Sequence, residues 1–388
     1  MRFRPVSFVS SDYGLAVVTL VIMSVQILAI EGWAVSMPKV AFMAVTPLFL
    51  WVKSPRISKA TVFGLLFWVV TVGLSVIQFG TPRMSTFYYT ALFLLMFNLY
   101  YNLVYVNHVF TIDDFLQVVK SVIMAYAICL VLQQAFFIVG LRYMPLVNLM
   151  GMPYYGLFRL NTLAVEPSHA ARLLTVYFYA FLKLLEYKQG VAPSISYLWQ
   201  EHKRTIIAFL YTMTAIGSGT AFVGLAILAL YFLRRQYVAY VVIFGFVFYM
   251  VVPMIDYEPL NRTMAVFNAT LSGDTELVRE TDHSASSRVN IILDTIKYLD
   301  LSDVDTWLGK GIDATYAADK VVVSAITDYG MISYLLKLAL FFSCCFTGLF
   351  SLEVLMFILL FSFNIGNVAY GWAALMVFST IKYFKSTR

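Results

Sequence analysis

Long apolar segments separated by short polar ones run along the whole chain. A helix that crosses about 30 Å of hydrocarbon needs about 20 mostly apolar residues. The break Gly217-Ser218-Gly219 predicts a tight helix pair, and the last apolar stretch is predicted to split near Asn364. Membrane helices are predicted at Tyr13–Ile30, Met37–Val52, Ala60–Phe79, Thr86–Tyr105, Phe115–Gly140, Ala171–Tyr187, Thr205–Ile216, Thr220–Phe232, Tyr237–Met254, Ile326–Phe350 and in two parts of Leu352–Phe384. The pattern therefore predicts roughly 12 spans.

The amino-acid composition is also typical of a membrane protein. The chain has 388 residues, of which 61% are hydrophobic and 12% are charged. A soluble domain has about 45–50% apolar and about 25% charged residues, so a soluble protein is excluded. Three cysteines in apolar segments do not form the framework of a disulfide-rich domain. We expect residues 1–388 to form a single all-α transmembrane domain, a polytopic helical bundle.

The distribution of lysine and arginine predicts the orientation. Cytoplasmic loops carry an excess of these residues. The basic clusters lie at the chain ends and near the loops after the second, sixth and eighth predicted spans, and the short loops on the other side contain few cations. The cytoplasmic set is Arg2, Arg4, Lys53, Arg56, Lys59, Lys183, Lys188, Lys203, Arg204, Arg234, Arg235, Lys382, Lys385 and Arg388. Both termini are therefore predicted to be cytoplasmic. The net charge of +6 is scattered over segment ends, so no nucleic-acid partner is expected.

Two segments stand out on the predicted outer side. Residues 141–170 form a moderately polar loop, and residues 255–325 form the one long hydrophilic stretch. Within the latter, Val289, Ile292 and Ile296 recur at helical spacing, which predicts an amphipathic helix. We expect a helical extracytoplasmic subdomain that closes a cavity over the membrane helices.

The loop at 141–170 ends in a candidate anion site. Pro167 suits the first turn of a helix, and the free N–H groups there attract phosphates. Arg159 and Arg172 add positive charge on either side, and Glu166 between them has the chemistry of a general base. Alternatively, Glu166 and Ser168 cap the helix while the arginines contact lipid headgroups.

Further candidates lie in the outer stretch and in one span. Arg288 falls early in the amphipathic helix and could reach a phosphate or a sugar hydroxyl. His283 is either a base or substrate contact, or a solvated loop residue. Lys337 lies deep in an apolar span, where a charge usually faces a cavity or a partner.

A metal site is not expected. Asp300, Asp303 and Asp305 have the spacing of metal ligands, but Ser302-Asp303 also fits a turn or a helix cap, which we favour. Nucleotide-binding loops, dinucleotide fingerprints and common hydrolase motifs are absent from the sequence, so the substrate is expected to arrive already activated. No cofactor is predicted.

Taken together, these motifs resemble the O-antigen and exopolysaccharide polymerases of the Wzy type, within the broader group that includes the O-antigen ligases. The resemblance runs from Arg159 to about Leu336. It rests on four motifs, which are Arg159…Glu166-Pro167-Ser168, Gly217-Ser218-Gly219-Thr220, Ser287-Arg288 followed by Gly309-Lys310-Gly311, and Asp328-Tyr329-Gly330. The ligases place a histidine shortly before the last glycine, where this chain has Val321-Val322-Val323-Ser324. That departure favours Glu166 as the base, with His169 or His283 in reserve.

The resemblance implies a GT-C-like fold and an inverting, metal-independent glycosyltransferase on the periplasmic face of the inner membrane. Its donor and acceptor would be glycans linked to undecaprenyl pyrophosphate, and a chain-length regulator could be a protein partner. By this resemblance Arg159, Glu166 and Arg288 are expected to be catalytic, and Arg172, His169, His283 and Lys337 to bind substrate. The alternatives are an O-antigen ligase acting on lipid A core, and a lipid-linked oligosaccharide flippase or transporter.

Overall fold

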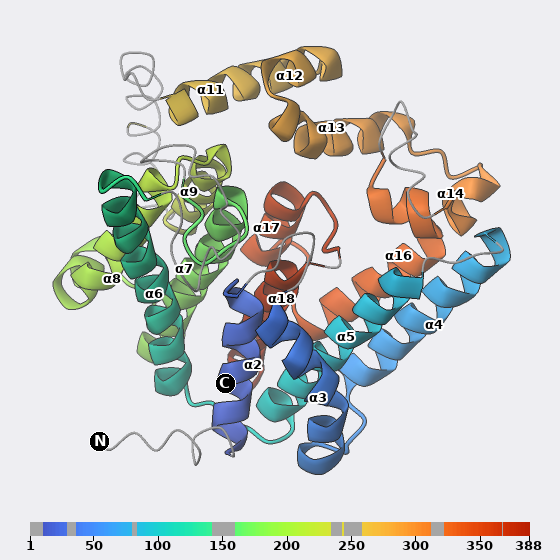
Figure 1. The fold of residues 1–388 in the computed structure, drawn as a ribbon, viewed down its shortest axis with the longest axis horizontal. Coiled ribbons are helices and arrows are strands. Elements are labelled where there is room, and N and C mark those ends of the chain that lie inside the picture. The colour runs from blue at the N-terminus through green and yellow to red at the C-terminus, as the bar shows by residue number, and fades with distance from the viewer. Residues whose placement is uncertain are drawn as a thin grey trace.

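A computed structural model of the chain describes residues 11–28, 36–79, 84–141, 160–233, 243, 258–311, 322–366 and 368–388. These residues form helices and no strands, which confirms the all-α prediction (Figure 1). The helices are α2 (Asp12–Ser24), α3 (Met37–Lys53), α4 (Lys59–Phe79), α5 (Met84–Tyr105), α6 (Ile112–Ile138), α7 (Pro167–Gln189), α8 (Ile195–Ala215), α9 (Gly219–Tyr231), α11 (Glu258–Leu271), α12 (Thr275–Thr281), α13 (His283–Tyr298), α14 (Val304–Leu308), α16 (Ser324–Cys344), α17 (Leu352–Phe361) and α18 (Ala369–Ser386).

Most predicted helices recur with shifted ends. The break at 217–219 and the split before α18 are both present, and Pro167 opens α7 as expected. Three helices differ more. α2 ends six residues before the predicted Ile30, and α16 ends six residues before the predicted Phe350. α8 begins at Ile195, ten residues before the predicted start, with non-helical backbone at His202. The span predicted at Tyr237–Met254 lies outside the described residues, apart from Ile243.

Four of the described helices are long and apolar enough to cross a membrane. They cover Lys59–Gln78, Phe87–Tyr105, Ile112–Ile138 and Ser324–Cys344. α2, α9 and α17 are apolar but shorter, with 13, 13 and 10 residues. The described chain is therefore compatible with a membrane helical bundle that has four candidate spans, and the larger count of roughly 12 stays a prediction.

α7 forms the centre of the bundle. Nearly all of its side chains are buried, and it lies against α6, α9 and α18. In Figure 1 it descends from the end of the molecule covered by α11–α13. The hydroxyls of Tyr177 and Ser24 lie 2.6 Å apart, which ties α7 to α2. Residues of α7 are therefore held in place by contacts with several neighbouring helices.

The segment that leads into α7 is held by α6. The side chain of Gln133 donates to the carbonyl of Thr162 at 3.2 Å and accepts from the Thr162 N–H at 2.8 Å. The Thr162 hydroxyl donates to the Tyr126 carbonyl at 2.7 Å. The amide of Asn161 donates to the Ala164 carbonyl at 2.9 Å and so closes the turn. These buried bonds fix the backbone immediately before Glu166.

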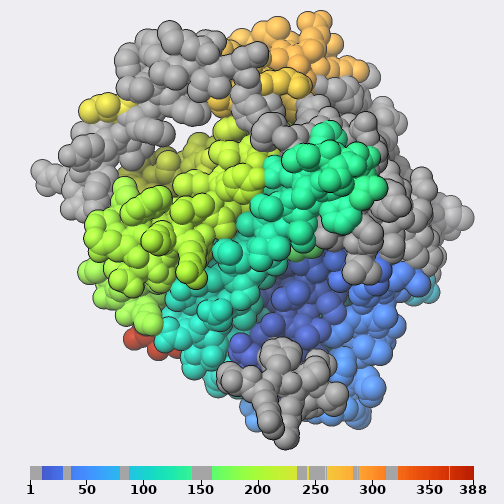
Figure 2. All heavy atoms as spheres, turned by 60° about the vertical axis from the view of Figure 1, so that its left-hand side comes forward, coloured from blue at the N-terminus to red at the C-terminus, as the bar shows by residue number. Residues whose placement is uncertain are grey.

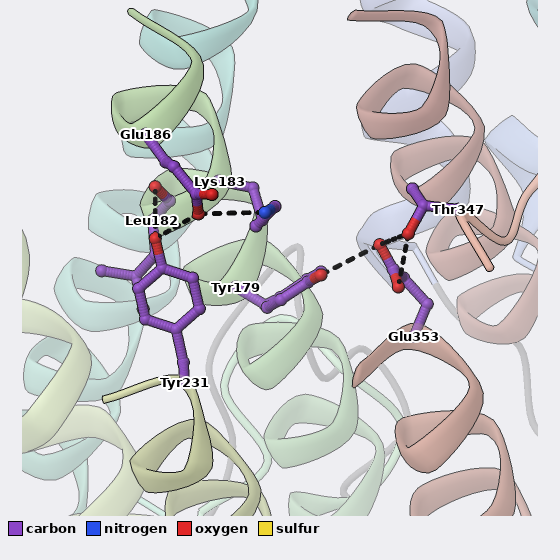
Figure 3. A network of polar contacts seen from close by, with 7 residues as sticks. All are labelled: Tyr179, Leu182, Lys183, Glu186, Tyr231, Thr347 and Glu353. Atoms are coloured by element: carbon purple, nitrogen blue, oxygen red, sulfur yellow. Dashed lines mark hydrogen bonds and ion pairs between the residues drawn. The ribbon is translucent and has the colours of Figure 1, made fainter. Parts of the chain in front are cut away.

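Polar contacts also join α7, α9 and α17 (Figure 3). Tyr179 of α7 donates to the buried carboxylate of Glu353 in α17 at 2.9 Å. Tyr231, at the end of α9, donates to Glu186 of α7 at 2.7 Å. A buried polar group is costly without a partner, so these bonds specify how the three helices lie together.

The outer stretch forms helices across one end of the bundle. α11, α12 and α13 lie above the membrane-type helices in Figure 1, and Figure 2 shows outer helices at the upper end of a face formed by α6, α8 and α9. α13 contains the predicted amphipathic helix and begins at His283, before the first apolar position of that pattern, Val289. Asp303 caps α14 by accepting from the Asp305 N–H at 3.0 Å, as the cap interpretation of these aspartates predicts.

Gly224 allows α9 to lie close to α7. A Cβ atom there would overlap the Thr175 hydroxyl and lie 3.2 Å from the Thr175 Cβ and 3.3 Å from the Met213 Cε. Thr175 cannot easily turn away, because its hydroxyl donates to the Ala171 carbonyl at 2.7 Å. The absence of a side chain at position 224 is thus a condition for the α7–α9 contact.

We expect Gly224→Ala to destabilise the protein by about 1–3 kcal/mol, the usual cost of overpacking a tight contact. The measurement is the midpoint of thermal unfolding of the purified protein in detergent. Gly73→Ala in α4 is the matched control, because a Cβ atom at position 73 has no neighbour within 4 Å. Equal midpoints for the two variants would contradict the proposed close contact.

Candidate functional site

A cavity of about 520 Å³ lies between the bundle and the outer helices. Its walls come from the first residues of α7 and α9, from α11 and α13, and from the end of α17. The lining residues are Glu166, Pro167, Ser168, Gly217, Ser218, Gly219, Thr220, Val223, Arg262, Thr263, Val266, Asp282, Arg288, Val289, Leu359 and Leu360. Residues of α11 and α13 therefore form part of the cavity wall.

Two helix amino termini meet at this cavity. α7 begins at Pro167 after the N-cap residue Glu166, and α9 begins at Gly219 after Ser218. Neither N-cap side chain makes a capping hydrogen bond. The first N–H groups of a helix and its dipole favour negative charge. Two such ends without side-chain caps create a local field suited to an anion.

Glu166 presents its carboxylate to the cavity. The side chain is 58% exposed and accepts a hydrogen bond from the Ser168 hydroxyl at 3.2 Å. Because this carboxylate does not cap α7, the alternative that it serves only as a helix cap is not supported. The rigid turn at 161–164 fixes the backbone beside it. A carboxylate exposed to a cavity has the chemistry to accept a proton from a hydroxyl group that binds beside it.

Arg288 reaches the same cavity from α13. Its guanidinium donates to the Thr220 hydroxyl in the first turn of α9 at 2.9 Å. Burial, followed by the positive charge of Arg172, lowers the pKa of Arg288 to about 10. The group is therefore still a cation at neutral pH. Arg262 of α11 lies in the same lining and pairs with Asp282 at 2.8 Å, which joins α11 to the start of α13.

Arg172 and His169 lie beside the cavity and share one aromatic partner. Arg172 is buried and donates to the Tyr370 hydroxyl at 2.6 Å. The His169 ring stacks on Tyr370 with centroids 4.1 Å apart, and its Nε2 lies 3.7 Å from a carboxylate oxygen of Glu166. Tyr370 thus connects two of the predicted residues to the base candidate.

The predicted residues fall into three groups. Glu166 and Arg288 line one cavity, with Arg172 and His169 adjacent to it. Lys337 lies elsewhere, because it donates to Asn364 at 2.7 Å and is not in the lining of this cavity. Arg159 and the side chain of His283 lie outside the described part of the structure.

Sequence reasoning missed two residues, Arg262 and Tyr370. Arg262 is one of several cations in the outer stretch, and the partner that holds it, Asp282, is twenty positions away. Tyr370 follows the split between α17 and α18, far from Arg172 in the chain. No sequence motif near either residue indicates that it belongs to the site, because helix packing brings both of them there.

Comparison of the chain with models of protein families, with curated proteins and with solved structures gives no match in any of the three.

An anion that fills the cavity should stabilise the protein. Inorganic pyrophosphate at ten times its Kd should raise the free energy of unfolding by about 1.4 kcal/mol. Thermal unfolding in detergent with and without pyrophosphate measures the effect. Since Arg288 is protonated below its pKa, the effect should persist at mildly alkaline pH and decline as pH rises through about 10.

Arg288→Ala should remove most of this stabilisation. Arg279→Ala is the control, because Arg279 lies on the neighbouring helix α12 with a side chain that is 61% exposed. Full stabilisation in the Arg288→Ala variant would show that the anion binds at another place.

Proposed function

We propose that this chain is a membrane glycosyltransferase that joins oligosaccharide repeat units linked to undecaprenyl pyrophosphate into O-antigen or exopolysaccharide. The reaction would take place on the periplasmic face of the bacterial inner membrane. The proposal combines the motif resemblance with the cavity, where a carboxylate and cations from separate helices meet. An O-antigen ligase remains the nearest alternative, since it would use the same donor.

The observation that carries the proposal is the mixed lining of the cavity. Arg288 and the amino-terminal ends of α7 and α9 provide positive potential, Arg262 is paired with Asp282, and Val223, Val266, Val289, Leu359 and Leu360 provide apolar surface. A soluble sugar nucleotide has no apolar chain that could pack against these apolar side chains. A lipid diphosphate has both an anionic group and an apolar chain, so its chemistry matches both kinds of surface.

The cationic groups favour departure of the lipid diphosphate. When the bond between the anomeric carbon and the phosphate oxygen breaks, the electron pair stays on that oxygen. Positive groups placed in advance around the developing charge lower the barrier. Arg288 has the strongest claim to this role, because the Thr220 hydroxyl fixes its guanidinium against α9. Arg172, beside the cavity, adds further positive charge.

Glu166 supplies the base. It accepts the proton from the acceptor hydroxyl as that oxygen forms its bond to the anomeric carbon. Attack opposite the leaving group inverts the configuration. Ser168 and His169 lie at 3.2 Å and 3.7 Å from the Glu166 carboxylate, where they restrict its orientation. The products are a lengthened glycan on the acceptor lipid, undecaprenyl pyrophosphate and a proton.

Deletion of the gene should reduce surface glycan to a single repeat unit on a gel, and the wild-type gene should restore the ladder. Glu166→Gln and Arg288→Ala should fail to restore it, with polymer reduced by about 100-fold or more, since each removes base or charge stabilisation. Glu276→Gln and Arg279→Ala are matched controls on α12, where both side chains are exposed. All four variants must be compared at equal protein level in the membrane.

The same gel separates the alternatives. Loss of all attached glycan in the deletion strain would indicate a ligase, and accumulation of lipid-linked repeats inside the cell would indicate a flippase. Full ladders in both Glu166→Gln and Arg288→Ala would remove these residues from the mechanism.

A further inference from the structure

An exposed apolar patch lies at the far end of the outer helices. We define the α14 patch as Leu301, Val304, Trp307 and Leu308. Val304 is 65% exposed and Leu301 is 56% exposed. The indole N–H of Trp307 donates to the Leu301 carbonyl at 2.8 Å, so its polar atom is already bonded. The exposed surface of the α14 patch is therefore mainly apolar.

The α14 patch is attached to the ends of two candidate spans. The side chain of Gln78, at the end of α4, donates to the Gly309 carbonyl at 2.8 Å. The N–H of Lys310 donates to the Thr327 carbonyl in α16 at 2.6 Å. Gly309 and Gly330 are in backbone contact, because a Cβ atom on Gly309 would lie 2.6 Å from the Gly330 nitrogen. α14 therefore lies at the level where α4 ends.

Exposed apolar side chains also lie at the end of α4. Val76 and Ile77, in its last turns, are 52% and 79% exposed, and both belong to a candidate span. A span exposes such side chains to lipid. In Figure 1 α14 lies beside the ends of α4 and α16, so the α14 patch and these side chains are at the same end of the bundle.

We propose that the α14 patch inserts into the interfacial layer of the membrane leaflet on the cavity side. A tryptophan with apolar neighbours at the end of a span is typical of that layer. The partner is the lipid surface itself. This inference does not depend on the reaction proposed above, because it uses only the position and chemistry of α14.

The carboxylates near the α14 patch indicate that its contact with lipid is apolar and not electrostatic. Asp300, Asp303 and Asp305 flank the apolar side chains, with Asp300 bonded to Ser302 and Asp303 capping α14. Carboxylates are repelled by anionic headgroups, so the attachment rests on apolar burial. Contact with a zwitterionic phosphatidylcholine bilayer should be at least as deep as contact with a phosphatidylglycerol bilayer, and added salt should not release it.

The contact would set the height of Arg288 above the bilayer. α13 has 16 residues and is therefore roughly 24 Å long. Arg288 lies near its start, and the α14 patch follows its end after a short turn. A helix anchored in this way keeps the outer subdomain over the cavity instead of leaving it free to swing.

Depth-dependent fluorescence quenching tests the proposal in the full chain. Val304→Cys is labelled with bimane and reconstituted at low protein density into phosphatidylcholine vesicles that contain lipids with a nitroxide at a shallow or a deep position. Labelling is selective because Cys129, Cys344 and Cys345 are buried. The label should be quenched more by the shallow nitroxide, at a depth of about 5–10 Å into the boundary of headgroups and acyl chains.

Two further positions serve as a positive and a negative control for this measurement. Ile77→Cys at the end of α4 should be quenched at least as strongly as Val304→Cys. Leu277→Cys on α12 is an equally apolar side chain in the outer subdomain, 43% exposed, and should not be quenched. Quenching at position 304 no stronger than at position 277 would overturn the proposal. So would a blue-shifted label that nitroxide lipids do not quench, since that would indicate a protein partner or a second copy on the patch.

Discussion

The close parallel packing of α7 and α9 is the constraint on which the candidate site depends. Both helices begin at the cavity, and the contact between Gly224 and Thr175 fixes their separation. Roughly 10 Å further along α9, the bond from Tyr231 to Glu186 fixes the same pair again. With two points of attachment, their amino termini cannot drift apart. The packing of the two helices therefore holds both of their positive dipole ends at the cavity.

Hydroxyl groups hold two of the arginines around the cavity. The Thr220 hydroxyl accepts from Arg288 and the Tyr370 phenol accepts from Arg172, whereas Arg262 is paired with Asp282. A hydroxyl accepts from a guanidinium N–H and so fixes the direction of the planar group. Two arginines are therefore oriented beside the cavity, while the third ties α11 to the start of α13.

The sequence predicted the class of fold, and it pointed to Glu166 and Arg288, which line one cavity in the structure. Apolar length marks a helix such as α4, and Pro167 after Glu166 marks a helix start. These are local signals. The role of Lys337 could not be read in the same way, because Asn364, its partner, comes from a loop after a different helix. Tyr370 and Arg262 were missed for the same reason, and α8 was predicted too short because its charged first half interrupts the apolar pattern.

The short length of α9 has an energetic consequence for any lipid ligand. Thirteen residues give a helix of roughly 20 Å, about 10 Å less than the hydrocarbon thickness of a bilayer. A headgroup held at its amino terminus would sit in a recess, below the plane reached by full-length spans. The apolar chain of such a ligand would then stay in the hydrocarbon layer, and the cost of about 0.8 kcal/mol for each CH₂ group moved into water would not arise.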